Sequence, residues 1–114
     1  MRVIQISDLH LSRTHGYFYE NWQVVLDELN SDRPDLVVIS GDVSFNGADE
    51  EDDIAFAMSE IARIDAPHVV IPGNHDIGDH RLSKKLDQPV NDERLSRWLA
   101  HCETDRFSWS GAGF

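Results

Sequence analysis

The sequence is poor in cysteine and has no long apolar segment. It has 114 residues and a single cysteine, Cys102. One thiol cannot form a disulfide within the chain, which excludes the disulfide-stabilised scaffold of small secreted proteins. No stretch approaches the roughly 20 apolar residues of a membrane-spanning helix, and the first residues do not resemble a signal peptide. We therefore expect a cytoplasmic protein that does not bind a membrane.

Basic residues are also few. Ten Lys and Arg face 21 Asp and Glu, which gives a formal net charge of −11. Binding to nucleic-acid phosphates needs clustered basic side chains, so we expect no nucleic-acid scaffold as a partner. An acidic chain can still bind an anionic substrate if its carboxylates hold divalent cations, whose charge then dominates the local field. The composition sets no expectation for the oligomeric state.

Three short apolar runs, residues 3–6, 36–39 and 69–71, predict β-strands. The second and third lack polar alternation and are rich in β-branched residues, as expected of strands buried on both faces. In each of the two segments between consecutive strands, apolar residues recur at the helical spacing i, i+3, i+4, i+7. The predicted helix faces consist of Trp22, Val25, Leu26 and Leu29, and of Ile54, Ala57, Met58, Ile61 and Ile64. This order predicts an α/β fold with a mostly parallel sheet built from βαβαβ units.

The remaining elements are predicted from local signals. Asp49 is the expected cap of the second helix, with the acidic residues 50–53 solvated at the positive end of the helix dipole. A third helix is expected over 92–101, capped by Asn91, with Leu95, Trp98 and Leu99 on one face.

Residues 77–90 are predicted to be a surface loop, and residues 106–110 a strand that opens a hairpin. Because that hairpin would be half finished, we expect residues 1–114 to be the N-terminal portion of a single larger domain.

Each predicted strand runs into a short polar motif: Ser7-Asp8-Leu9-His10, Ser40-Gly41-Asp42 and Pro72-Gly73-Asn74-His75-Asp76. The carboxyl ends of parallel strands meet at one edge of a sheet, where ligand sites form. We therefore expect six side chains at one rim, those of Asp8, His10, Asp42, Asn74, His75 and Asp76. Residues i and i+2 of an extended segment point to the same side, so Asp8 and His10 could reach one ion. Carboxylate, imidazole and amide ligands suit manganese, iron, zinc or magnesium.

These motifs resemble the first three signature blocks of the calcineurin-like metallophosphoesterases, with Gly47 following Gly41-Asp42 as in the second block. The stretch from Asn21 to Asn30, the acidic start of the second helix, and Trp98-Leu99 followed by Phe107-Ser108-Trp109 look most like the branch of class III cyclic-nucleotide and glycerophosphodiester phosphodiesterases. The resemblance implies half of a four-layer α/β/β/α sandwich. It implies that Asp8 and His10 bind a first metal ion, that Asp42 bridges two ions, and that Asn74 binds the second. His75 would act on the substrate phosphate, with Asp76 orienting its imidazole through a hydrogen bond.

The implied activity is hydrolysis of a phosphodiester or phosphomonoester by a hydroxide activated by two transition-metal ions, with Mn, Fe or Zn expected. The implied substrate is a small phosphate ester such as a cyclic nucleotide or a glycerophosphodiester. The family completes its metal centre with further histidines, and His15, His68, His80 and His101 do not stand in those contexts. The 114 residues alone are therefore expected to be an incomplete enzyme.

Two alternatives remain open from the sequence. The first is a catalytically inactive module that keeps the fold for binding or regulation. The second is another α/β phosphotransfer fold of the receiver or dehalogenase type, with Asp8 or Asp42 as the nucleophile. Such folds need a lysine at a strand end, and no lysine stands at the end of a predicted strand here.

Overall fold

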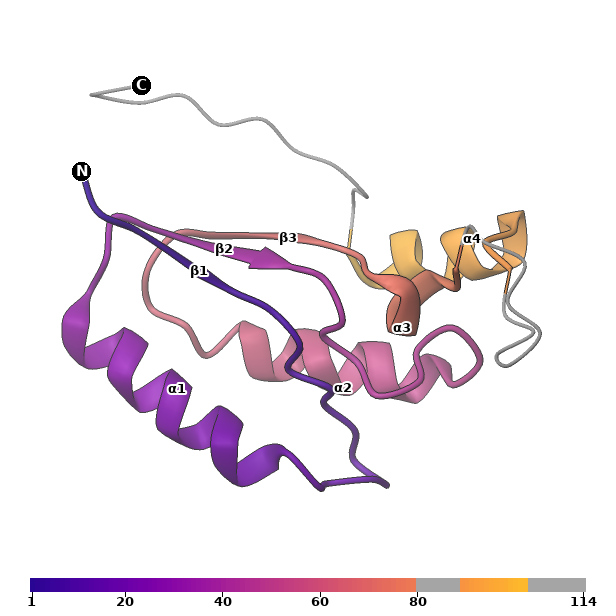
Figure 1. The fold of residues 1–114 in the computed structure, drawn as a ribbon, viewed down its shortest axis with the longest axis horizontal. Helices are drawn as coiled ribbons and strands as arrows, with labels where there is room; N and C mark the ends of the chain where they lie inside the picture. The colour runs from indigo at the N-terminus through magenta and orange to yellow at the C-terminus, as the bar shows by residue number, and fades with distance from the viewer. Residues whose placement is uncertain (80–88, 103–114) are drawn as a thin grey trace.

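The structure, a computed structural model, describes residues 1–79 and 89–102. Its sheet has three parallel strands in the order β1-β2-β3, namely Val3–Ile6, Leu36–Ser40 and His68–Ile71. Four helices accompany them: α1 (Tyr19–Asp32), α2 (Glu51–Ile61), α3 (Asn74–Ile77) and α4 (Asp92–His101). The predicted α/β fold with a parallel sheet is confirmed (Figure 1).

Helices α1 and α2 cover the same side of the sheet (Figure 1), because each joins neighbouring parallel strands by a crossover of the same hand. The strands turn alternate residues toward these helices, including Val37 and Ile39 of β2 and Val70 of β3. The helices pack against these residues with the predicted apolar faces. The most buried members of those faces are Trp22, Leu26, Leu29, Ile54, Ala57 and Ile61. The hydrophobic core therefore lies between the sheet and this helix pair.

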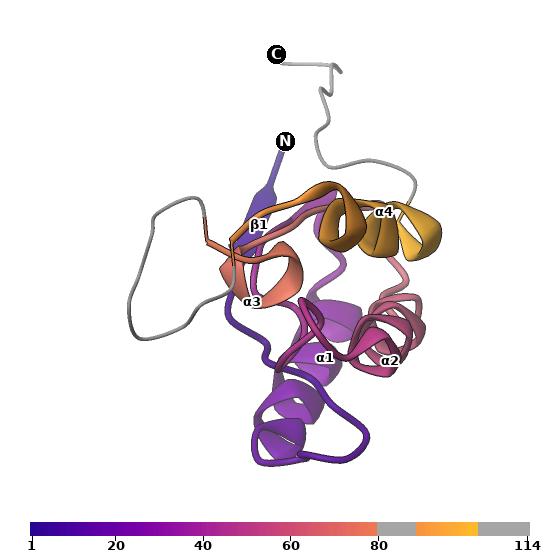
Figure 2. The ribbon, with the colours of Figure 1, turned by 90° about the vertical axis from the view of Figure 1, so that its right-hand side faces the viewer.

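Helix α4 confirms the predicted third helix and its cap. The Asn91 side-chain oxygen accepts a hydrogen bond from the Arg94 backbone N–H at 2.8 Å, as a helix N-cap does. Trp98 is fully buried, whereas Leu99 is 39% exposed. The helix packs against α2 and α3 (Figure 2), so the end of the chain that the structure describes supports the loops after β2 and β3.

The predicted role of Asp49 is wrong. Helix α2 begins at Glu51 with Glu50 at its N-cap, and no side chain caps it. Asp49 instead accepts a hydrogen bond from Arg94 of α4, with 2.8 Å between Oδ1 and Nη2. Asp53 is not solvated as expected: it is 3% exposed and accepts hydrogen bonds from Ser12 Oγ at 2.6 Å and from the Asn46 N–H at 3.1 Å. Arg94 and Ser12 lie far from these aspartates in the sequence, so helix-terminus rules could not show them.

The segment predicted as a loop over 77–90 is only partly described. It begins with the last residue of the one-turn helix α3, and an isolated bridge joins Asp79 to Pro89. Residues 80–88 and the strand predicted over 106–110 lie outside the described residues. In the described part, no helix is long and apolar enough to span a membrane.

Candidate metal centre

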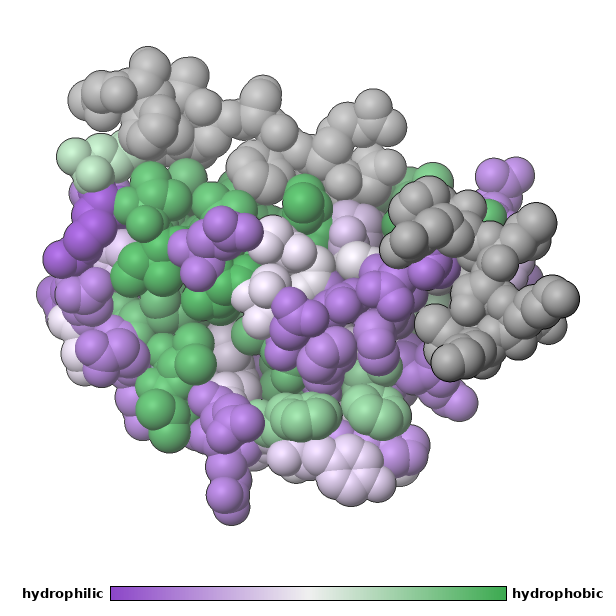
Figure 3. All heavy atoms as spheres, in the orientation of Figure 1, coloured by the Kyte–Doolittle hydropathy of each residue, from purple (hydrophilic) through white to green (hydrophobic). Residues whose placement is uncertain are grey.

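The polar motifs that follow the three strands lie side by side at one edge of the sheet. Backbone hydrogen bonds join the first two motifs, from the Asp8 N–H to the Gly41 carbonyl at 3.1 Å and from the His10 N–H to the Asp42 carbonyl at 3.0 Å. The third joins through the His75 N–H, which donates to Asp42 Oδ1 at 3.0 Å. On the face seen in Figure 3, polar side chains gather over these segments, and apolar ones lie over the strands.

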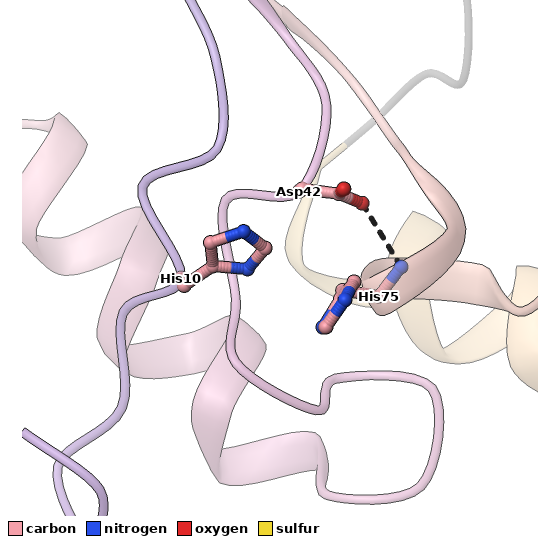
Figure 4. Close-up of side chains that lie close together, drawn as sticks. All are labelled: His10, Asp42 and His75. Atoms are coloured by element: carbon pink, nitrogen blue, oxygen red, sulfur yellow. Dashed lines mark hydrogen bonds between the residues drawn. The ribbon is translucent and has the colours of Figure 1, made fainter. Parts of the chain in front are cut away.

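Three side chains of this rim offer ligand atoms to a common point. One atom each from His10, Asp42 and His75 lies within 4.8 Å of the others (Figure 4). The His10 and His75 rings meet edge to face with centroids 4.5 Å apart. Asp8 lies beside them, with its Oδ1 3.5 Å from His10 Nε2 and its side chain 62% exposed. Each strand end thus contributes at least one group that can bind a cation.

The backbone at the rim is strained. Asp8, His10 and Asp42 have φ values of 61°, 47° and 53°, a region that non-glycine residues rarely adopt and that costs about 1–3 kcal/mol each. The expected extended conformation of Asp8-Leu9-His10 is therefore wrong, although the two side chains still meet. Strain of this kind persists where surrounding contacts over-determine the conformation, and it concentrates at functional sites.

Two glycines permit the close approach of the second and third motifs, each for its own reason. Gly41 has a φ of 97°, which only glycine adopts without cost. Gly73 has an ordinary φ of −114°, but a Cβ atom there would lie 2.3 Å from Asp42 Oδ1. Glycine at 73 is thus required by the space that the Asp42 carboxylate occupies.

The Asn74 side-chain amide lies against the Asp42 carboxylate. Its oxygen points toward the Asp42 carboxylate, so that two acceptors face each other. Turned over, the amide nitrogen would donate to both carboxylate oxygens at 3.2 and 3.3 Å. The amide can therefore present its nitrogen to the Asp42 carboxylate as a donor, or its oxygen to a cation as a ligand. The donor set of carboxylates, imidazole and amide oxygen is that of a Mn, Fe or Zn site, so the residues present fit a divalent transition metal.

The His75 ring is oriented by a backbone carbonyl. Its Nδ1 atom lies 2.7 Å from the Phe45 oxygen. A carbonyl oxygen can only accept, so Nδ1 carries the proton, and Nε2 is left for a metal ion or a substrate. The geometry groups His75 with the possible metal ligands, whereas the sequence resemblance assigns it to the substrate.

The prediction that Asp76 accepts a hydrogen bond from the His75 ring is wrong, because the ring nitrogen Nδ1 faces the Phe45 carbonyl. Asp76 is fully buried, and its oxygens accept hydrogen bonds from the loop after β2 and from Gly73. Burial raises the pKa of the Asp76 carboxyl group, and these hydrogen bonds oppose the rise. The Asp76 carboxylate therefore binds backbone and hydroxyl groups inside the protein and is not part of the surface of the rim.

The other described histidines lie apart from the cluster. His68 Nδ1 lies 2.9 Å from the Ala66 carbonyl, and His101 Nε2 lies 3.0 Å from Glu51 Oε1. His15 stacks on the Phe45 ring with centroids 4.9 Å apart. Sequence reasoning missed the Phe45 carbonyl, because a backbone group leaves no trace in the residue type.

Two comparisons with known proteins bear on this site. A family model described as calcineurin-like phosphoesterase matches residues 1–111. A relative from Arcobacter nitrofigilis, named probable glycerophosphodiester phosphodiesterase GpdQ, is 33% identical over 96 residues. That alignment covers 77% of this chain and 34% of the relative, so the chain spans about a third of the length of the protein it matches.

Proposed function

Because this chain belongs to the calcineurin-like phosphoesterase family, we propose that the rim is the metal-binding part of a binuclear centre that hydrolyses a small phosphate ester. The family supports metal-dependent hydrolysis of phosphoesters in general. The name of the relative favours a glycerophosphodiester as the substrate, and a cyclic nucleotide or a phosphomonoester is the next candidate.

The observation that carries the proposal is the convergence of His10, Asp42 and His75 within 4.8 Å at strand ends. We assign Asp8 and His10 to a first ion, Asp42 to a bridge between two ions, and the Asn74 amide oxygen to the second. When bound, the ions would offset the charge of the phosphate and lower the pKa of the attacking water. Four protein ligands are few for two ions, so we propose that residues outside the described ranges complete both coordination shells.

His75 is assigned to the phosphoryl group. With Nδ1–H donated to the Phe45 carbonyl at 2.7 Å, its Nε2 atom is the one available to the substrate. In the protonated ring, Nε2–H can donate a hydrogen bond to a phosphoryl oxygen or a proton to the leaving oxygen. Its backbone N–H meanwhile holds Asp42 Oδ1, which ties the position of this ring to the proposed bridging carboxylate.

The experiment measures hydrolysis of bis(p-nitrophenyl) phosphate and of a glycerophosphodiester by the full-length protein loaded with Mn²⁺. In His75→Ala, turnover should fall by about 10²–10⁴, the usual contribution of a positioned general acid, while metal content stays near that of the wild type. The loss should be smaller with the nitrophenyl leaving group, which needs little protonation. His68→Ala is the matched control, because His68 is half-buried at the start of β3, away from the rim.

Three results would change the assignment. Loss of metal in His75→Ala would make His75 a ligand. Metal binding without hydrolysis of any ester would support the inactive binding module instead. A wild-type protein that binds no divalent metal would refute the proposed function.

A further inference from the structure

The Asp76 carboxylate links the two loops that carry Asp42 and Asn74. One oxygen accepts from the Ser44 N–H at 2.9 Å and from Ser44 Oγ at 2.5 Å. The other accepts from the Gly73 N–H at 2.8 Å and the Val43 N–H at 3.3 Å. Four donors from two loops thus converge on one side chain that is completely buried.

The donors belong to residues next to the proposed ligands. Val43 and Ser44 follow Asp42 directly, and Gly73 precedes Asn74. The Ser44 hydroxyl also accepts the Gly47 N–H at 3.1 Å, so it bridges the carboxylate to the far side of the same loop. The carboxylate therefore fixes the backbone on both sides of the rim.

The same loop delivers the carbonyl that orients His75. Phe45 follows Ser44 in the chain, and its N–H donates to the Leu11 carbonyl at 2.9 Å. The Phe45 carbonyl oxygen accepts a hydrogen bond from His75 Nδ1 at 2.7 Å. Beyond it, the Ala48 N–H donates to the His75 carbonyl at 3.0 Å. A shift of the Ser44 backbone would move the Phe45 oxygen and release the ring.

We propose that Asp76 is a positioning residue for His75, acting through Ser44 and the Phe45 carbonyl to fix the imidazole in the Nδ1–H tautomer. The inference rests on the proposed function in one respect, namely that His75 acts on the substrate. An asparagine cannot replace the carboxylate, because its NH₂ group would face two of the four donors. Asp76→Asn therefore breaks the link at constant size.

A second serine serves as the control for this role. The Ser44 hydroxyl belongs to the Asp76 link. The Ser59 hydroxyl is exposed on α2 and donates to the Phe56 carbonyl of the same helix at 2.7 Å. Ser44→Ala should therefore release His75, whereas Ser59→Ala should not.

The tautomer is read from the side-chain nitrogen NMR signals of His75 in the full-length, zinc-loaded protein. Wild type and Ser59→Ala should show a single Nδ1–H form, whereas Ser44→Ala and Asp76→Asn should show a mixture of both tautomers. Turnover with an alkyl leaving group should fall by about 10- to 100-fold in the latter two, and less with nitrophenyl. Metal content should stay near the wild-type value in Ser44→Ala, which keeps the Val43 and Gly73 hydrogen bonds to Asp76, and should fall in Asp76→Asn, which disturbs the backbone beside Asp42 and Asn74.

Either of two results would overturn the proposal. One is a wild-type His75 without a proton on Nδ1. The other is a Ser44→Ala protein that keeps both the single tautomer and the leaving-group dependence of the wild type, which decides the matter even if Asp76→Asn fails to fold. A wild type that hydrolyses no phosphoester would refute the proposed function, while the tautomer comparison would still judge the positioning of the ring.

Discussion

Replacing Gly73 with alanine tests whether close backbone approach sets the position of Asp42. A Cβ atom at residue 73 would lie 2.3 Å from Asp42 Oδ1, 2.6 Å from its backbone nitrogen and 2.9 Å from its Cγ. Real Cβ atoms essentially never approach closer than 3.0 Å, so Asp42 or the Gly73 segment must move by about 0.7 Å. The φ of −114° at Gly73 suits alanine, so the effect comes from this contact and not from backbone strain.

A displacement of this size should weaken metal binding strongly. Misplacing a group at a site by about 1 Å can cost about 10²-fold in activity, so we expect Mn²⁺ affinity to fall by about 10- to 100-fold in Gly73→Ala. Crowding a packed site should also lower the free energy of unfolding by about 1–3 kcal/mol. Calorimetric titration with Mn²⁺ measures the first effect, and urea unfolding of the metal-free protein measures the second.

The control is Gly16→Ala, because a Cβ atom at Gly16 would meet nothing within 4 Å. It should match the wild type in both experiments. If Gly73→Ala bound Mn²⁺ with wild-type affinity, the position of the Asp42 carboxylate would not depend on its close contact with residue 73. Our explanation of this glycine would then be refuted.

Two further predictions concern stability. Asn91→Ala removes the α4 cap and should lower the free energy of unfolding, measured in urea, by about 1 kcal/mol. Ser96→Ala, at an exposed position of the same helix, should change it little. Equal effects of the two substitutions would argue against the cap. Mn²⁺ at about 100 times its dissociation constant should stabilise the folded protein by about 2.7 kcal/mol, because the metal binds the folded site. Thermal unfolding with and without a chelator measures this stabilisation. An unchanged Tm would contradict a preformed site.

The strands, helices and rim were predictable because each follows from a local pattern. The apolar spacing on α1 and α2 marks the residues that pack on the sheet, and the cap of α4 has a clear signal in Asn91. Convergence of the three polar motifs follows from the geometry of any parallel sheet, since strand ends meet at one edge. No detail of side-chain packing was needed for these inferences.

The hydrogen bonds in and around the site could not be predicted, because most of them join residues distant in sequence. Asp49 and Asp53 stand in one acidic run, yet one pairs with Arg94 and the other with Ser12. Asp76 has no distinctive sequence signal either, since three of its four donors are backbone N–H groups. Residue types alone do not show which loops approach each other closely enough to form such bonds.

We propose that the rim binds two ions and that Asp42 bridges them. The decisive measurement is the metal content per chain of wild type and Asp42→Asn, determined by elemental analysis of the full-length protein after dialysis. We predict two transition-metal ions in the wild type and weakened retention of both in Asp42→Asn, because the bridge loses its negative charge. Unchanged metal content in Asp42→Asn would contradict the bridging assignment and with it the proposed binuclear centre.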